Sequence, residues 1–301
     1  MRRVAVLHGG ISAEREVSLH SGAQVIQALQ TAGYEVVGVE VNADLSALIS
    51  ALTPPPDVVF NALHGRFGED GTLQGVLDYM GIPYTHSGVL ASALAMDKAA
   101  AKAVFAQAGL PVAPHRIIEI TELADHHPLP PPYVVKPVNE GSSVGVHIIK
   151  AGDNRSADIV RGWSFGPAMV EQYVPGRELT VCVMEDHALF VTEIVTGEEF
   201  YDYHAKYAEG GSHHVIPAKI PEEITRRAME ISLAAHRALG CRGATRADLR
   251  FDATGNQLVL LEVNTQPGMT ATSLLPEQAA LAGMDFPSLC AWMVERATCR
   301  V

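Results

Sequence analysis

The stretch Leu258–Thr270 reads LVLLEVNTQPGMT, an apolar run that ends in two oxygen-bearing side chains. Side chains alternate between the faces of a strand, so Glu262 and Asn264 should point to one face and Val263 to the other. A buried strand that ends in two oxygen ligands on one face suits a hard divalent cation. This stretch therefore predicts a buried strand with a candidate metal site at its end.

A second apolar run, Ala244–Phe251, precedes this strand and carries Asp248. The turn Asp252–Asn256 joins the two runs, which predicts a hairpin that brings Asp248 beside Glu262 and Asn264. Three such oxygen ligands could hold a divalent cation. The alternative is three solvated polar side chains on an edge hairpin, and this stretch alone leaves both open.

The composition indicates a multidomain, acidic chain. Its 301 residues predict two or three domains, and a hydrophobic content of 48% with a mean hydropathy of +0.12 allows a large core. The net charge of −12 argues against nucleic-acid binding, which needs basic patches for phosphate contacts. An anionic substrate must therefore be bound by a few placed cations.

Neither a membrane span nor an oxidised framework is expected. No apolar run approaches the ~20 residues that cross a bilayer, and Val4–Leu7 is too short for the core of a signal peptide. The four cysteines contain no CxxC pair, which favours reduced thiols at Cys182, Cys241, Cys290 and Cys299. We therefore expect a cytoplasmic protein with no membrane partner.

The first part of the chain alternates strand and helix patterns. Strands at Val4–Leu7, Glu35–Val41 and Val58–Phe60, with helices between them, predict a parallel sheet with helices on both faces. Ligands bind at the carboxyl ends of such strands, where His8-Gly9-Gly10 and Asn61–Gly65 follow. The G-x-G-x-x-G spacing is absent, which opposes a nicotinamide oxidoreductase.

Several polar residues near these strand ends also have ordinary explanations. Glu14 can be a carboxylate that favours the start of a helix, and His64 can be a packing residue. Ser87 is expected to cap a single Ala-rich helix, Val89–Ala108, on which Lys98 could simply be solvated.

A glycine- and serine-rich segment, Glu140–Gly145 (EGSSVG), follows the strand Tyr133–Pro137 and its Lys136. The alternation of Val144 and later apolar residues predicts a hairpin with this segment at its tip. The tip offers N–H and hydroxyl donors to phosphate oxygens, and Lys136 supplies positive charge. The G-K-[ST] ending of a Walker A loop is absent, which excludes a P-loop NTPase. A plain flexible hairpin is the alternative.

The rest of the chain combines strands, two helices and one aperiodic loop. Residues 198–214 are polar and aromatic without a period, which is typical of a functional lid. The backbone of residues 171–174 could recognise an adenine edge. Strands are expected at Ala168–Val174, Leu179–Met184 and Ala188–Thr196, and helices at Glu222–Leu239 and near Ser288–Thr298.

Five motifs occur in order along nearly the whole chain. They are HGGISAEREVSL at 8–19, LHG at 63–65 with GEDGTLQG at 68–75, EGSSVG at 140–145, YDYHAKY at 201–207 and LEVNTQPGMT at 261–270. The set resembles the D-alanine–D-alanine ligases of the ATP-grasp superfamily. Its spread along the chain argues against chance.

The resemblance implies an α/β chain with the ATP-grasp fold. A Rossmann-like substrate domain would span 1–97, followed by central and C-terminal α+β domains at 98–184 and 185–301 that clamp ATP. It also implies ATP-dependent ligation of two D-alanines through an acyl phosphate for peptidoglycan synthesis, with two Mg²⁺ (or Mn²⁺) ions. A homodimer would fit the family.

The resemblance further implies a ligand for each site residue. Phosphates would be held by Lys98, Lys136, Ser143 and Lys206, adenine and ribose by Glu171, Gln172, Val174 and Glu178, and the metal ions by Asp248, Glu262 and Asn264. Glu14, linked to Ser142 and Tyr207, would bind the ammonium group of the first D-alanine, and His64 would lie near its carboxylate. Arg246 and the N–H of Gly268 would form an oxyanion hole. Ser273 and Leu274 would contact the carboxylate of the second D-alanine.

The residue chemistry agrees with this scheme. ATP and a carboxylate are both anionic, so lysines and metal ions are needed to neutralise charge as they approach each other. Fixed hydrogen-bond donors then stabilise the tetrahedral oxyanion. His204 and Asn139 differ from the residues that the family often carries at those places, and His204 is assigned no role. Tyr207 favours the dipeptide over D-alanyl-D-lactate. A non-catalytic nucleotide-binding regulator is the rival from another class, and the presence of the metal and oxyanion residues opposes it.

Overall fold

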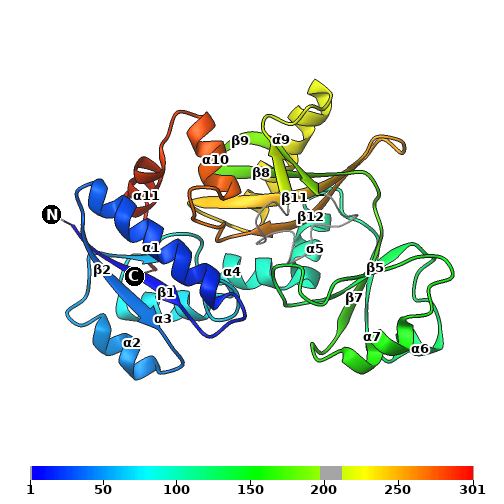
Figure 1. The fold of residues 1–301 in the computed structure, drawn as a ribbon, viewed down its shortest axis with the longest axis horizontal. Helices are drawn as coiled ribbons and strands as arrows, with labels where there is room; N and C mark the ends of the chain where they lie inside the picture. The colour runs from blue at the N-terminus through cyan, green and yellow to red at the C-terminus, as the bar shows by residue number, and fades with distance from the viewer. Residues whose placement is uncertain (1, 197–211, 301) are drawn as a thin grey trace.

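The computed structural model describes residues 2–196 and 212–300, and three sheets with their helices make up this part of the chain (Figure 1). A parallel sheet lies on the left of Figure 1, a five-stranded sheet above the centre, and a four-stranded sheet on the lower right. Among the described residues, no helix is both long and apolar enough to cross a membrane.

The parallel sheet has the order β2-β1-β3. Its strands are β1 (Arg3–Gly9), β2 (Glu35–Val41) and β3 (Val58–Asn61). Because side chains alternate along β1, Val4 and Val6 enter a different core cluster from Ala5 and Leu7. Strands β1 and β3 are therefore buried on both faces, as the sequence predicts, while the edge strand β2 is mostly exposed.

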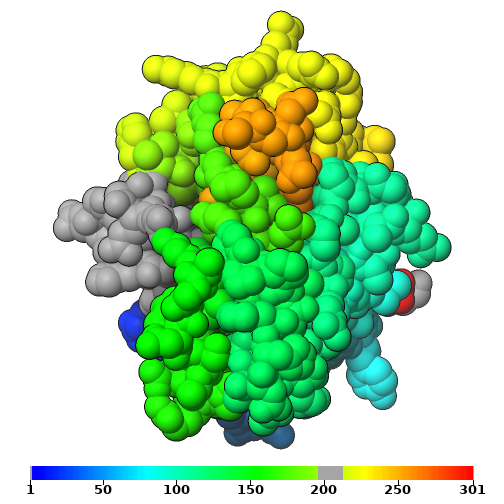
Figure 2. All heavy atoms as spheres, turned by 90° about the vertical axis from the view of Figure 1, so that its right-hand side faces the viewer, coloured from blue at the N-terminus to red at the C-terminus, as the bar shows by residue number. Residues whose placement is uncertain are grey.

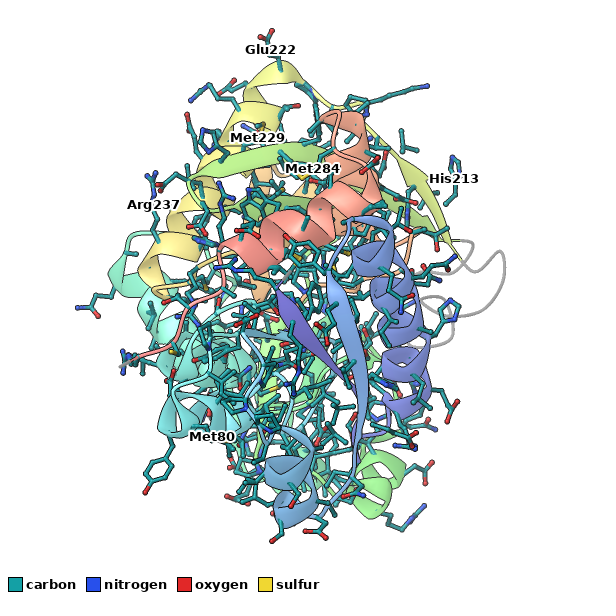
Figure 3. The ribbon with its side chains drawn as sticks, turned by 90° about the vertical axis from the view of Figure 1, so that its left-hand side faces the viewer. Met80, His213, Glu222, Met229, Arg237 and Met284 are labelled. Atoms are coloured by element: carbon teal, nitrogen blue, oxygen red, sulfur yellow. The ribbon has the colours of Figure 1, made fainter. Side chains whose placement is uncertain are left out.

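Four helices cover these two faces. Buried residues of α1 (Arg15–Thr31) and α11 (Phe286–Glu295) share a cluster with Val4 and Val6. Those of α2 (Leu45–Ala51) and α3 (Thr72–Met80) share the other cluster, with Ala5 and Leu7. Figure 3 shows α11 against α1, and Met284 is labelled where α10 and α11 (274–281 and 286–295) join. The end of the chain thus returns to the N-terminal sheet, where Arg2 pairs with Glu295.

The four-stranded sheet is antiparallel and has the order β4-β7-β5-β6. Short helices α6 (Glu122–Asp125) and α7 (Ser156–Gly162) pack on it through Leu123 and Ile159. The predicted hairpin is present, but its second strand begins only at His147, so Val144 belongs to the tip. The strands are β4 (His115–Ile118), β5 (Tyr133–Pro137), β6 (His147–Ile149) and β7 (Ala168–Gln172).

The five-stranded sheet is also antiparallel and has the order β10-β9-β8-β11-β12. Helix α9 (Glu222–Ala238) covers one face, and α10 (Leu274–Leu281) packs on β8 and β9 from the other. Glu222 and Arg237, labelled in Figure 3, mark the two ends of α9. The strands are β8 (Arg177–Met184), β9 (His187–Thr196), β10 (Ser212–Val215), β11 (Ala244–Asp252) and β12 (Gln257–Asn264).

The β11–β12 hairpin has the predicted pairing, with one irregularity. Asp248 lies opposite Glu262, and the next pair along is Leu249 with Leu260, so one residue of β12 bulges out. The bulge reverses the alternation of β12 at this point. Leu260 and Val263 therefore both enter the core, while Glu262 faces the other way.

The prediction of a single helix over 89–108 is wrong. The chain forms α4 (Val89–Met96) and α5 (Lys98–Gln107), broken at Asp97, whose backbone is extended. The Asp97 carboxylate accepts a bond from the N–H of Ala100 at 2.9 Å and caps α5. Ser87 caps neither helix and contacts the main chain of Arg242 instead.

The proposed domain boundary between 184 and 185 falls between β8 and β9, which pair in one sheet. The division into three domains therefore stays a prediction. The sequence patterns also missed the short elements α6, α7, α10, β4 and β10.

One buried histidine lies where the parallel sheet meets the five-stranded sheet. His86 has a φ of 68°, in the left-handed region, and its ring packs edge-on against Phe60. Its carbonyl accepts a bond from Arg242 at 2.9 Å. Burial lowers the pKa of His86 from 6.5 to about 3. The ring is therefore neutral in the folded protein near neutral pH.

We predict that His86→Asn reduces the pH dependence of stability between pH 6.5 and about 3. In that window the unfolded chain binds a proton at His86 and the folded chain does not, so stability falls as the pH falls. Asn tolerates left-handed backbone and does not titrate there. Denaturant unfolding at several pH values should show a slope smaller by up to one proton, about 1.4 kcal/mol per pH unit.

His236, whose pKa burial lowers to about 4, should maintain part of the slope. The control is His126→Asn at an exposed position, which should leave the slope unchanged. An unaltered slope in His86→Asn would contradict the assignment.

Candidate active site

A pocket lies between the four-stranded and five-stranded sheets. Figure 2 shows the side of the molecule where the lobe that holds β5 and β7 meets the turn between β11 and β12. Charged side chains from both sheets and from α5 line this pocket. They include Lys98, Lys136, Glu171, Glu178, Asp248 and Glu262. Three residues predicted to bind phosphate, Lys98, Lys136 and Ser143, therefore share one cavity with Asp248 and Glu262 of the predicted metal ligands. The third predicted metal ligand, Asn264, lines the neighbouring pocket.

The Glu140–Gly145 tip reaches from this pocket to Glu14, at the start of α1. Ser142 and Ser143 have φ values of 49° and 60°, in the left-handed region that L-residues seldom adopt. The Ser142 hydroxyl donates a hydrogen bond to the Glu14 carboxylate. Gly65 lies so close to Glu14 that a Cβ on it would meet Oε2 at 2.9 Å. The predicted link between Glu14 and Ser142 is thus present.

Three lysines approach the pocket wall from two elements. Lys98, the first residue of α5, donates to the carbonyl of Glu140, and its Nζ lies 3.9 Å from Glu262. Lys136 on β5 donates to the Glu171 carboxylate at 2.6 Å. Lys102, one turn after Lys98, pairs with the other oxygen of Glu171 and is fully buried. Sequence reasoning did not single out Lys102, because a helical lysine is usually solvated.

The polar residues of the β11–β12 hairpin that line the pockets interact with one another. Arg246 donates to both oxygens of Asp248, at 2.9 and 2.8 Å, and Thr180 donates to one of them at 2.7 Å. The Asp248 carboxylate raises the pKa of Arg246 against the opposing effect of burial, so the guanidinium stays charged. Asn264 lies opposite Arg246 across the ladder.

The donor set fits a hard divalent cation. Asp248 and Glu262 face each other on paired strands, and Asn264 adds an amide oxygen that already accepts the N–H of Gln266 at 2.7 Å. All three are oxygen donors, which Mg²⁺ prefers. Among the described residues no group of three His, Cys, Asp or Glu has metal-binding geometry, so Asn264 would have to complete the set.

A second pocket adjoins the first and extends to the first turns of α1. Lys98, Glu140, Ser142 and Glu262 line both pockets, so the two share a wall. The other residues predicted to hold amino acids or the oxyanion line the second pocket. These are Glu14, His64, Arg246, Gly268, Ser273 and Leu274.

The half-buried carboxylate of Glu69 orients His64 in this pocket. Nδ1 of His64 lies 3.2 Å from Glu69, whose carboxylate also accepts the N–H of Gly65 at 3.0 Å. Nε2 lies 3.4 Å from the hydroxyl of Ser21. Burial raises the pKa of Glu69 against the opposing effect of His64. Sequence reasoning assigned no role to Glu69, although it stands in the quoted GEDG motif.

The loop after β12 is tied to the N-terminal sheet. Gln266 donates to the carbonyl of Leu63, and its amide oxygen accepts a bond from Asn61 at 2.8 Å. Gly268 approaches Ser273 so closely that a Cβ would meet its hydroxyl at 2.9 Å. Ser273 occupies the N-cap position of α10, so the loop and the start of α10 form one edge of the second pocket.

The residues predicted for the base and ribose lie along β7 and β8. Gln172 is exposed and Val174 is buried, and both line the first pocket. Arg250, which the sequence analysis did not select, donates to the carbonyl of Val174 at 3.2 Å and lies 3.4 Å from Glu178. The predicted roles of Lys206 and Tyr207, like the position of His204, fall outside the described residues.

Known proteins resemble this chain over its full length. The family model for the D-ala D-ala ligase C-terminus matches residues 104–295, and the model for the N-terminus matches 45–87. A D-alanine–D-alanine ligase of Acidiphilium cryptum is 70% identical and covers 100% of both chains. One of Granulibacter bethesdensis is 66% identical and covers 100% of this chain and 99% of its own.

Two solved structures support the same relationship. A D-alanine–D-alanine ligase from Bacillus anthracis superposes with a TM-score of 0.84 at 33% identity, covering 98% of this chain and 97% of that one. The enzyme from the same organism complexed with ATP gives 0.82 at 28% identity, with the same coverage. The chain therefore belongs to the D-alanine–D-alanine ligase family and has the ATP-grasp fold that its motifs implied.

Proposed function

We propose that this protein joins two D-alanine molecules to D-alanyl-D-alanine at the expense of ATP, in the cytoplasm, for peptidoglycan synthesis. The observation that carries the proposal is the wall that the two pockets share. A nucleotide in the first pocket and an amino acid in the second would meet at Lys98, Ser142 and Glu262. Membership of the family supports the same reaction.

The first half of the reaction makes the carboxylate reactive. One oxygen of the first D-alanine attacks the γ-phosphorus of ATP, the bond to the β-phosphate oxygen breaks, and an acyl phosphate and ADP result. Both reactants are anionic, so positive charge must lie between them. Lys98 and Lys136 are suited to this, with Ser143 as a further phosphate donor. Glu14 would hold the ammonium group of this D-alanine, and Ser142 fixes the orientation of Glu14.

Two Mg²⁺ or Mn²⁺ ions would be held by Asp248, Glu262 and Asn264, and they would neutralise charge on the phosphates. Two hydrogen bonds from Arg246 hold the Asp248 carboxylate in place, so this predicted metal ligand is oriented before a metal ion binds.

The second half forms the peptide bond. The amine of the second D-alanine attacks the acyl carbon and the carbonyl oxygen becomes an oxyanion. Phosphate leaves as the carbonyl reforms and takes up the proton that the nitrogen gives up. Arg246 and the N–H of Gly268 would stabilise that oxyanion. Ser273 and Leu274, at the start of α10, would hold the second carboxylate. His64 would lie near the first D-alanine, with Glu69 holding its ring.

The alternative is a ligase of the same fold that joins D-alanine to D-lactate or another acceptor. Phosphate release should be measured with ATP, Mg²⁺ and D-alanine, L-alanine or no amino acid, followed by mass analysis of the product. Release only with D-alanine, with a D-alanyl-D-alanine product, would support the proposal. A requirement for D-lactate would replace it with the depsipeptide reaction, and no release would favour a nucleotide-binding regulator. Sedimentation of the same sample would test the expected homodimer.

We predict that Glu262→Gln lowers kcat by about 100-fold or more and changes the affinity for ATP much less. Charge held at Glu262 matters most as the phosphoryl group moves, when negative charge is redistributed. Turnover at saturating Mg²⁺ and ATP binding by calorimetry separate the two effects. Glu230→Gln, at an exposed position on α9, is the control. Near-normal turnover of Glu262→Gln would contradict the assignment of Glu262 as a metal ligand.

We predict that Glu14→Gln raises the KM for the first D-alanine by about 10-fold or more, because the ammonium would lose a charged partner. The KM for ATP should change little. Ser142→Ala should have a smaller effect in the same direction, since it removes a hydrogen bond to Glu14 but leaves the charge of Glu14 in place. Steady-state kinetics with each substrate varied in turn would test this. An equal rise in both KM values would contradict the assignment of Glu14.

A further inference from the structure

A buried lysine outside the pocket lining completes a three-residue charge cluster behind the nucleotide pocket. Lys102 is 0% exposed and pairs with one oxygen of Glu171, while Lys136 binds the other oxygen. Lys136 and Glu171 line the pocket, but Lys102 does not. Lys102 can therefore affect a nucleotide only through its charge and through Glu171.

The three residues come from three separate elements. Lys102 is on α5, Lys136 on β5, and Glu171 on the neighbouring strand β7. On α5, Ala101 and Phe105 face the core under the five-stranded sheet, which turns Lys102 toward β7. Since Lys98 and Lys102 are four residues apart, they lie on one face of the helix. A single helix thus contributes one lysine to the pocket wall and another behind it.

The charge count shows what Lys102 adds. With Lys136 alone, Glu171 would form a neutral pair, and the ammonium of Lys136 would have little net charge to offer a phosphate. With Lys102 present, two ammonium groups share one carboxylate and the cluster carries a net charge of about +1. Burial lowers the pKa of Lys102, and the nearby Glu171 opposes that effect. The two lysines together lower the pKa of Glu171 in spite of its burial, so the carboxylate is ionised.

A buried unpaired charge is expensive, so a second lysine on one buried carboxylate needs an explanation. A polyanion in the pocket would provide one, because it would balance the excess positive charge. A purely structural pair would need only one lysine for the one carboxylate. Within these three residues cation exceeds anion, and the carboxylate of Glu262 also acts on Lys102 by its charge. The excess within the cluster is the observation on which the inference stands.

We propose that Lys102 is a positioning residue for the nucleotide phosphates. It holds the Glu171 carboxylate from behind and takes a share of its negative charge, which leaves Lys136 with net positive charge toward the phosphate groups. The inference rests on the proposed function, since it takes ATP as the ligand of the first pocket. It adds to the predicted phosphate ligands a residue that touches no phosphate.

The test compares nucleotides that differ only in phosphate number. Isothermal titration calorimetry should measure the binding of ATP, ADP and adenosine to the unsubstituted chain and to Lys102→Met. We expect Lys102→Met to weaken ATP binding by about 10-fold or more, the size expected when one unit charge near a polyanion is removed. ADP should be affected less, and adenosine by less than about 3-fold. Lys219→Met, which removes an exposed lysine outside the pocket lining, should change none of the three.

A double variant tests the charge count itself. Lys102→Met with Glu171→Gln leaves Lys136 as the single charge of the cluster, so the net charge returns to about +1. The ratio of ATP affinity to adenosine affinity should then return to within about 3-fold of its original value, even if Glu171→Gln weakens binding of the base. Lys102→Gln keeps a donor for Glu171 and gives the same comparison if Lys102→Met does not fold.

Each other outcome counts against the inference. An equal loss for adenosine and ATP would mean that Lys102 acts on the base or on the fold, and would overturn it. Unchanged ATP affinity in Lys102→Met and Lys102→Gln, with ATP bound by the unsubstituted chain, would overturn the inference alone. Failure of the unsubstituted chain to bind ATP would overturn the proposed function and this inference with it.

Discussion

The constraint on which the site depends is the repulsion between two anions. A carboxylate and a triphosphate must approach each other within a protein that itself carries a net charge of −12. Local cations therefore have to outweigh the overall field. The break at Asp97 starts α5 at the edge of the pocket, with Lys98 as its first residue and Lys102 on the same face. The positive end of the helix adds to both charges.

The bulge in the β11–β12 hairpin allows a strand of the core to end in polar ligands. In an unbroken strand, Leu258, Leu260 and Glu262 would all point the same way. The bulge changes the alternation between Leu260 and Glu262, so both leucines stay in the core and the carboxylate enters the pocket opposite Asp248. The apolar run and the ligand pair can therefore follow each other directly in the sequence.

Much of the fold and the grouping of the site could be predicted because both follow from local patterns. The parallel sheet and the hairpin that joins Asp248 to Glu262 come from alternation and from turn residues. The break at Asp97 could not be predicted in this way, since Ala-rich sequence on both sides favours a continuous helix. Lys102 and Glu69 were missed for another reason. Their partners, Glu171 and His64, identify them only once the chain has folded.

Residues from every part of the fold line the two pockets taken together, so the proposed reaction needs all three sheets in place. Glu14 is the N-cap residue of α1, which packs on the parallel sheet. Ser142 lies in the tip that precedes β6 of the four-stranded sheet, and Glu262 lies near the end of β12 in the five-stranded sheet. The bond from Ser142 to Glu14 and the bonds from Gln266 to the N-terminal sheet join these parts. No one sheet could carry out the proposed reaction by itself. The relative placement of the three sheets is therefore as much a part of the site as any side chain.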